Sequence, residues 1–450
     1  MLSGPLAAIA IIALCRHAGL PPAAAGTAAL ALWCALWWVF EPVPIPITSL
    51  LPLALLPLFG VLTPAQVGAA YGSPLVLLLM GGFMLSKAME HSGAHRRVAL
   101  EMVRLCGDKD QRRLVIGFML AAALLSMWIS NTATTLMLLP VATAVLAQHP
   151  KDGLAAALFL GIAYAASIGG IATPIGTPPN LVFMEVYGQQ TGATPGFVEW
   201  MSWGLPVVIL LLPAAALWLT RDLGGLPAPS VPPVGPWQPA ERRTLLVFAL
   251  TATLWITRQE PFGGWSQWLA LPAANDASVA LLAVVTLFLI PDGRGGRLLT
   301  WEAAEKIPWG VLILFGGGIA IAKAFDQSGL GRAMGEAIAG IGAWPLWLAL
   351  LLICASVTFM TEMTSNTATT VLLMPVLAVA GIAAGIDPAL LMVPAAMSAS
   401  CAFMLPVATA PNAIVYGSGR VSAPQMARTG LVVNLIGIGC ISGVIALRLG

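Results

Sequence analysis

Apolar residues follow one another in this chain in long runs, and short polar connectors separate the runs. A helix that crosses the hydrocarbon core of a bilayer needs about 20 mostly apolar residues. The runs therefore predict an all-α bundle of transmembrane helices. The expected spans cover residues 5–20, 24–40, 47–62, 74–90, 154–187 and 204–219 in the first half, and 243–256, 277–290, 311–325, 389–416 and 429–447 in the second.

Four further features interrupt this pattern. The runs 114–129 and 133–147 are too short to span, and a polar SNT triplet lies between them. They predict the two arms of a re-entrant hairpin whose tip lies at mid-membrane, and 345–380 predicts a second hairpin with its tip at 365–367. The spans 154–187 and 389–416 each contain Gly, Pro and Thr residues that cannot stay helical, so both are expected to be broken helices.

Three blocks of sequence recur in the same order in the two halves. KAMEHSG at 87–93 returns as KAFDQSG at 323–329, SNTATT at 130–135 returns unchanged at 365–370, and ATPIGTPPN at 172–180 corresponds to MLPVATAPN at 404–412. These blocks predict a duplicated unit of about 210 residues, a common plan for transporters. Residues 1–225 form the first expected repeat, with scaffold helices in 1–113 and the hairpin and broken helix in 114–219. A Pro-rich linker, 226–240, leads to the second repeat, 241–450, with scaffold helices in 243–330 and the hairpin, broken helix and last span in 345–448.

The count of about 11 spans plus two hairpins places the two repeats in opposite orientations. Lys and Arg are enriched in cytoplasmic connectors of membrane proteins. With the amino terminus in the cytoplasm, 15 of the 21 basic residues fall in cytoplasmic connectors, including Lys109 and Lys151, and four fall on the other side. The remaining two, Lys87 and Lys323, lie within spans. The basic residues thus support an inverted repeat with a cytoplasmic amino terminus, and we read 5–20 as a retained span and not as a cleaved signal peptide.

Composition narrows the class of function. Hydrophobic residues make up 58% of the 450 residues and charged residues only 9%, whereas soluble domains carry about 25% charge. This composition excludes a soluble enzyme. The net charge of +2 gives no reason to expect a nucleic-acid partner, and the six scattered cysteines form no CxxC pair that would predict a disulfide framework or a metal site.

The four breaks in the helices are the candidate functional site. Backbone that leaves its helix inside a membrane is tolerated only where it is buried in protein or lines a wet cavity. Each break supplies helix N-termini, which suit an anion, and free carbonyl groups, which suit a cation. Ser and Thr in membrane helices often bond only to their own helix, but two identical triplets at related breaks favour an anion site flanked by sodium sites.

These motifs resemble the divalent anion:sodium symporter family, which includes dicarboxylate and citrate carriers. The resemblance rests on the two SNT tips, the Gly-Gly pairs that precede KAMEHSG and KAFDQSG, and the TPPN and TAPN breaks, and it covers essentially the full chain. It implies an elevator mechanism in a homodimer, in which a transport domain of hairpins and broken helices moves against fixed scaffold helices. Ala410 departs from the pattern, since Pro178 occupies the matching position of the first half.

The resemblance also implies roles for individual residues. The substrate carboxylates are expected to contact the tips and the break threonines, and two sodium ions are expected at the hairpin arms and break backbones. The substrate-binding residues are Ser130, Asn131, Thr132, Ser365, Asn366, Thr367, Thr177 and Thr409. The sodium ligands are Ser126, Ser130, Asn131 and Gly176 at one site, and Thr361, Ser365, Asn366 and Ala408 at the other.

Other polar residues within the runs have simpler interpretations. Lys87 and Lys323 each precede an acidic residue by three positions, Glu90 and Asp326, and local ion pairs are favoured over substrate contact. Glu362 adjoins the second tip where the first half has Met127, and a structural hydrogen-bonding role is favoured over proton coupling. His91 and His95 have the spacing of metal ligands but no third ligand nearby, so we do not expect a zinc site.

The sequence therefore predicts a secondary transporter of the inner or plasma membrane that imports C4-dicarboxylates (succinate, malate, fumarate) together with sodium. No enzyme activity and no cofactor are expected, and sodium is a co-transported substrate. A citrate or sulfate carrier and a sodium-independent dicarboxylate exchanger remain open, because the same short polar groups serve all these anions. An intramembrane enzyme or a transporter-like receptor is a more remote alternative, since no nucleophile with a base occurs within the spans.

Overall fold

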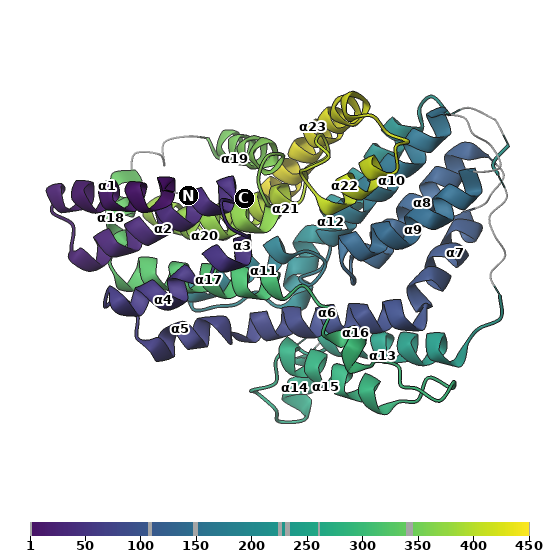
Figure 1. Ribbon diagram of the computed structural model, residues 1–450, viewed down its shortest axis with the longest axis horizontal. Coiled ribbons are helices and arrows are strands. Elements are labelled where there is room, and N and C mark those ends of the chain that lie inside the picture. Colours follow the sequence, from purple (N-terminus) through teal and green to yellow (C-terminus); the bar gives the residue numbers. More distant parts are fainter. Residues whose placement is uncertain are drawn as a thin grey trace.

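The protein was analysed as a computed structural model that describes residues 2–106, 110–146, 152–223, 227–229, 235–259, 262–338 and 345–449. These ranges contain the helices α1 to α23, and the only β-contacts within them are two isolated bridges (Figure 1). The predicted all-α class is confirmed. Lys109 and Lys151 lie outside the described residues, as do 226 and 230–234 of the linker 226–240.

Seven helical segments in the described ranges are long and apolar enough to cross a membrane. This finding supports a multi-pass membrane protein. The segments are Pro22–Phe40, Pro64–Ser92, Gly153–Gly170, Phe197–Thr220, Trp309–Gln327, Asn366–Ala383 and Ala423–Arg448. They belong to helices α2, α5 with α6, α10, α12, α17, α20 and α23.

Two short helices, α7 (Ala94–Cys106) and α18 (Leu330–Ile338), lie in stretches where the sequence predicted no helix. Both follow the recurring KA…SG block. Polar and apolar residues alternate in them at the period of a helix. A search for uninterrupted apolar runs passes over such helices, because half of their surface is polar.

The two hairpins are built alike. Helix α8 (Gln111–Ser126) turns into α9 (Asn131–Leu146), and α19 (Leu346–Thr361) turns into α20 (Asn366–Ala383). In each hairpin the serine of the SNT triplet starts the second helix, since Ser130 Oγ accepts a bond from the Ala133 N–H and Ser365 Oγ accepts one from the Ala368 N–H. Side-chain acceptors of this kind satisfy the free N–H groups of a helix start.

The two broken helices follow the hairpins. One consists of α10 (Asp152–Gly170) and α11 (Pro178–Thr191), the other of α21 (Ala389–Ala399) and α22 (Ala410–Gly417). Each half then ends in a long helix, α12 (Phe197–Thr220) or α23 (Ala423–Arg448). The halves interlock, because α11 packs against α20 and α21, α22 packs against α9 and α10, and α12 packs against α23.

The remaining helices surround this interlocked group. They are α1 (Ser3–His17), α2 (Pro22–Phe40), α3 (Ile45–Thr48), α4 (Leu51–Leu58), α5 (Pro64–Tyr71), α6 (Pro74–Ser92), α13 (Pro239–Ile256), α14 (Gly264–Trp268), α15 (Asp276–Leu289), α16 (Trp301–Ala304) and α17 (Trp309–Gln327). Helix α6 packs along α15 and α13, and α17 packs along α5. Figure 1 shows α13 to α16 gathered on one side of the long α6.

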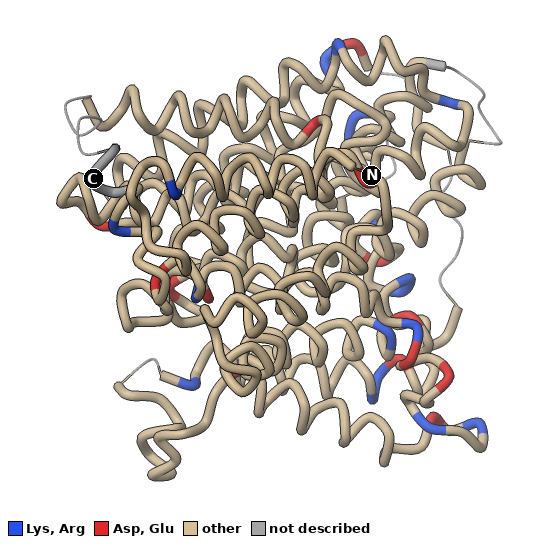
Figure 2. Tube along the Cα trace, turned by 60° about the vertical axis from the view of Figure 1, so that its left-hand side comes forward, with Lys and Arg blue, Asp and Glu red and all other residues tan. Residues whose placement is uncertain are grey.

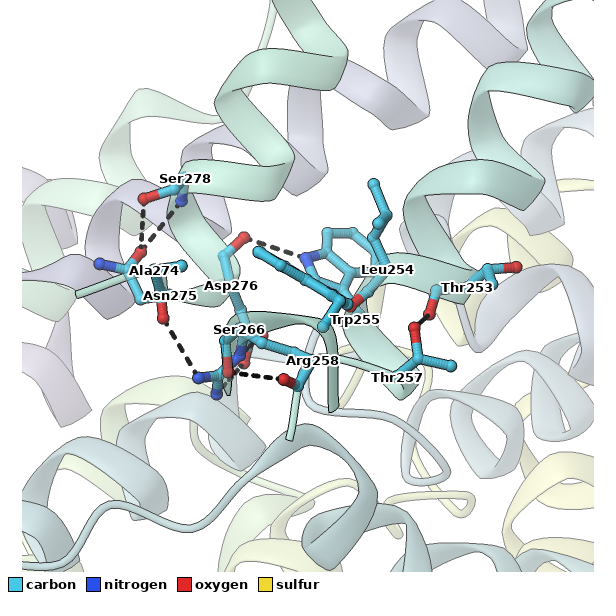
Figure 3. A network of polar contacts seen from close by, with 11 residues as sticks. Thr253, Leu254, Trp255, Thr257, Arg258, Ser266, Ala274, Asn275, Asp276 and Ser278 are labelled. Carbon is cyan, nitrogen blue, oxygen red and sulfur yellow. Dashed lines mark hydrogen bonds and ion pairs between the residues drawn. The ribbon is translucent and has the colours of Figure 1, made fainter. Parts of the chain in front are cut away.

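A polar network fixes the connection between α13 and α15 (Figure 3). Arg258 donates from Nε to Asp276 Oδ1 at 2.6 Å and from a terminal nitrogen to Oδ2 at 3.4 Å, and Trp255 Nε1 donates to the Asp276 carbonyl at 2.9 Å. Both charged side chains are largely buried. A two-pronged arginine–carboxylate pair of this kind holds its partners in a defined orientation.

A second ion pair attaches α7 to the start of α13. Arg97 donates from Nε to Glu241 Oε2 at 2.6 Å and from a terminal nitrogen to the Pro236 carbonyl at 2.7 Å, and its guanidinium lies 4.5 Å from the centre of the Trp237 ring. Figure 2 shows that Lys and Arg gather toward the side of the molecule where the amino terminus lies, whereas few lie near the carboxyl terminus.

Candidate functional site

One cavity of about 1040 Å³ brings together both hairpin tips and both helix breaks. Helices α9, α20, α11 and α22 all begin at its wall, so four helix N-termini face the same space. Ten of the twelve residues predicted to bind substrate or sodium line it, namely Ser130, Asn131, Thr132, Gly176, Thr177, Ser365, Asn366, Thr367, Ala408 and Thr409. Ser126 and Thr361 lie behind the tips and are fully buried.

The first tip is in tight contact with the first break. Ser126 Oγ donates a short hydrogen bond to Asn131 Oδ1. A methyl group placed on Gly170 would lie 2.8 Å from Asn131 Oδ1, and one placed on Gly176 would lie 2.5 Å from the Gly170 carbonyl oxygen. Two glycines are therefore required for the break backbone to reach the tip, and they bring carbonyl and amide oxygens together.

The second tip repeats this arrangement with different side chains. Thr361 Oγ1 lies 2.8 Å from Asn366 Oδ1 and 3.0 Å from the Ala399 carbonyl oxygen. A hydroxyl, an amide oxygen and a backbone carbonyl thus converge here. Oxygen groups of this kind are the ligands that hard cations prefer.

Two asparagines that had no predicted role hold the breaks in shape. Asn180 Nδ2 donates to the carbonyls of Gly170 (2.9 Å) and Thr173 (2.7 Å), and Asn412 Nδ2 donates to those of Ala402 and Leu405, both at 3.0 Å. The acceptors lie ten and seven residues before the asparagine in both halves. The final Asn of TPPN and TAPN was the signal that could have identified them.

Glu362 forms structural hydrogen bonds, the role that the sequence analysis favoured over proton coupling. Its Oε1 accepts bonds from the N–H groups of Phe403 (2.8 Å) and Met404 (2.9 Å), and its Oε2 accepts one from the Leu405 N–H at 2.9 Å. Asn434 Nδ2 donates to Oε1 at 2.7 Å. The carboxylate therefore caps the backbone of the second break and ties it to α23.

The two intramembrane lysines differ. Lys87 lines the cavity and pairs with Glu90 at 2.7 Å, as predicted. Within the described ranges no ion pair joins Lys323 to Asp326, so that expectation is wrong. Lys323 belongs to α17, which packs against α11, so the distant Glu185 of α11 lies within range of its charge.

Groups near the mouth of the cavity complete its lining. His95 lies there, at the start of α7, and its Nδ1 is 2.7 Å from the Met89 carbonyl oxygen. Burial lowers the pKa of His95, although the bond to Met89 opposes the shift. No group of three potential metal ligands (His, Cys, Asp, Glu) occurs among the described residues.

The chemistry of the site follows from these groups. The tips and breaks carry hydroxyls, amides and N–H groups but neither Lys nor Arg. Four helix N-termini provide partial positive charge for an anion, and carbonyl and hydroxyl oxygens provide ligands for small cations. The cavity can therefore hold an anion and cations side by side without a fixed cationic side chain at the tips.

Comparisons with known proteins agree with this chemistry. A sequence model of a family described as "Citrate transporter" matches residues 35–389. The chain is 40% identical to the sodium-dependent dicarboxylate transporter SdcS of Staphylococcus saprophyticus over 97% of this chain and 88% of the relative. It is 39% identical to SdcS of Staphylococcus aureus over the same shares.

The fold has a counterpart among solved structures. The YdaH transporter of Alcanivorax borkumensis superimposes with a TM-score of 0.60 at 18% identity, over 87% of both chains. At this level of identity the likeness concerns the fold.

Proposed function

The chain belongs to the citrate transporter family, and from that premise we propose that it imports C4-dicarboxylates such as succinate, malate and fumarate by symport with sodium. The observation that supports this proposal most is the single cavity lined by two SNT tips and two broken helices. Short neutral donors and four helix N-termini suit the two carboxylates of a small dianion.

Sodium coupling has a physical basis in the same cavity. Burying two negative charges without compensation is strongly unfavourable. Lys87 is already paired with Glu90. Two sodium ions supply the missing positive charge, one held by Ser126, Ser130, Asn131 and the Gly176 backbone, the other by Thr361, Ser365, Asn366 and the Ala408 backbone.

An elevator movement of an inverted repeat fits the packing. The hairpins, broken helices and long closing helices of the two halves interlock with one another, so they form the proposed moving unit. Helices α1 to α6 and α13 to α17 form the proposed scaffold. A homodimer formed through these helices holds the scaffold fixed while the other unit moves. The two halves carry matched elements in the same order, which supports about 11 spans and two hairpins.

The cavity opens toward the cytoplasm in the proposed topology. Glu41, Glu90, His95 and Lys306 line it, and all four lie at connectors or helix ends assigned to the cytoplasmic side, where the amino terminus lies. We therefore propose that the structure is an inward-facing state in an inner or plasma membrane.

Uptake into proteoliposomes tests the proposal. Labelled succinate should accumulate with an inward sodium gradient, and unlabelled malate and fumarate should compete. Citrate and sulfate should compete poorly. Uptake that is unchanged when choline replaces sodium would refute the coupling, and stronger competition by citrate or sulfate would refute the substrate class.

A further inference from the structure

The two halves differ sharply at one position beside the tips. Glu362 follows Thr361 at the end of α19, whereas Met127 follows Ser126 at the matching end of α8. In the first half the Met127 backbone carbonyl accepts a bond from Thr173 Oγ1. In the second half the Glu362 side chain performs the contact between hairpin and break.

The surroundings of Glu362 present hydrogen-bond donors that match a carboxylate. Three backbone N–H groups and the Asn434 amide all donate to its oxygens at 2.7 to 2.9 Å. A carboxylate only accepts hydrogen bonds, so four donors match its chemistry. The charge is therefore held in place by four neutral donors.

This charge is buried and has no basic partner in the described ranges. The Glu362 residue is 3% exposed. None of the ion pairs formed within the described residues includes it. Neutral donors reduce the unfavourable energy of a buried charge, but a nearby cation compensates it more fully.

The neighbourhood also retains unused acceptor oxygens. Oδ1 of Asn434 and Oδ1 of Asn412 are buried without a hydrogen-bond partner in the described part of the chain. Asn412 bonds the same break that Glu362 caps, since its amide donates to the Leu405 carbonyl while Glu362 accepts from the Leu405 N–H. Asn180 Oδ1 in the first half is likewise buried without a partner among the described residues, so the Glu362 carboxylate is the group that distinguishes the second tip.

We infer that Glu362 makes the two cation sites unequal, because its fixed charge strengthens sodium binding at Thr361, Ser365, Asn366 and Ala408, and the first site has no such charge. The inference rests on the proposed sodium coupling. Glu362 is a positioning residue in this scheme. It shapes the break through hydrogen bonds and attracts the cation through space, so the second site fills at lower sodium concentration than the first.

Sodium-dependent thermal stability of the purified full-length protein in detergent tests this inference without transport. Chloride salts of sodium and choline are mixed at constant ionic strength, and the unfolding temperature gives the sodium midpoint. E362Q removes the charge and should raise the midpoint of the tighter sodium phase about tenfold or more. N434A removes one donor but keeps the charge, and it should shift the same sodium midpoint by less than about threefold.

Two further variants separate charge from folding. M127Q places the same neutral amide at the matching position of the first half and should leave the tighter phase unchanged. E362D keeps the charge. The sodium midpoints of E362D and N434A must therefore both stay within about threefold of that of the unmodified protein, even if E362Q fails to fold. Succinate affinity at saturating sodium should be unchanged in every variant that folds.

The outcomes are distinct. An unshifted midpoint in folded E362Q, or an equal shift in E362Q and N434A, would overturn the inference while sodium coupling stands. A tenfold loss in E362D would also overturn it. An unmodified protein that sodium does not stabilise would overturn both the inference and the proposed coupling.

Discussion

Replacement of Gly176 by alanine is the most direct test of the first cation site. A Cβ at this position would lie 2.5 Å from the Gly170 carbonyl oxygen and 2.9 Å from the Gly170 Cα. Real Cβ atoms essentially never approach closer than 3.0 Å, so the break must open by half an ångström or more. Gly170 is itself packed against the Asn131 amide, and the displacement therefore reaches the proposed sodium ligands.

The expected size of the effect follows from overpacking. Forcing a methyl group into a closely packed site costs about 1 to 3 kcal/mol, which corresponds to roughly 5- to 150-fold in an equilibrium constant. If this strain is relieved by distorting the ligands, the sodium concentration for half-maximal succinate uptake should rise by about that factor. Uptake into proteoliposomes across a range of sodium concentrations measures it.

A second glycine provides the matched control. Gly82 of α6 lines the same cavity, but a Cβ there would meet its nearest neighbour, Ile175, at an ordinary 3.8 Å. Gly82→Ala should therefore keep the sodium dependence of the unmodified protein within about twofold. Uptake by Gly176→Ala with normal sodium dependence would refute the placement of a cation at the first break.

Three further results are expected. Asn131→Ala and Asn366→Ala should each abolish uptake while the protein still inserts and purifies, because each removes a side-chain amide that lines the cavity at a hairpin tip, and normal uptake in both would refute the site. Arg97→Met should lower the unfolding temperature, since it leaves Glu241 buried without its partner, a loss of about 3 to 5 kcal/mol for buried pairs; an unchanged melting curve would show that α7 is not anchored there. Burial lowers the pKa of His95, so the unfolded chain binds a proton more readily and stability should fall as the pH drops below about 6.5; His95→Gln should flatten that part of the stability profile, and an unaltered profile would contradict the assignment.

The sequence by itself determined the class of fold and predicted ten of the residues that line the cavity. Long apolar runs can only be buried in lipid or in protein, so the all-helical membrane architecture followed from hydropathy alone. The repeated SNT triplets and Pro-containing motifs identified the helix breaks, because Ser, Asn and Pro act locally on the backbone. These local rules placed the ends of α8, α9, α19 and α20 close to where the structure has them.

Sequence patterns were less informative for contacts between distant segments. Spacing predicted a local pair for both Lys87 and Lys323, but among the described residues only Lys87 forms it. The amphipathic helices α7 and α18 were missed because their apolar residues never form a run.

Only the tertiary structure decided how the breaks are held together. It showed that Asn180 and Asn412 bind break carbonyls and that Glu362 caps three backbone N–H groups 41 to 43 residues further along the chain. The physical reason is that a buried polar group must find a partner, but its chemistry does not specify which one. The sequence therefore determined which groups required partners, and the packing of the two halves determined which partners they found.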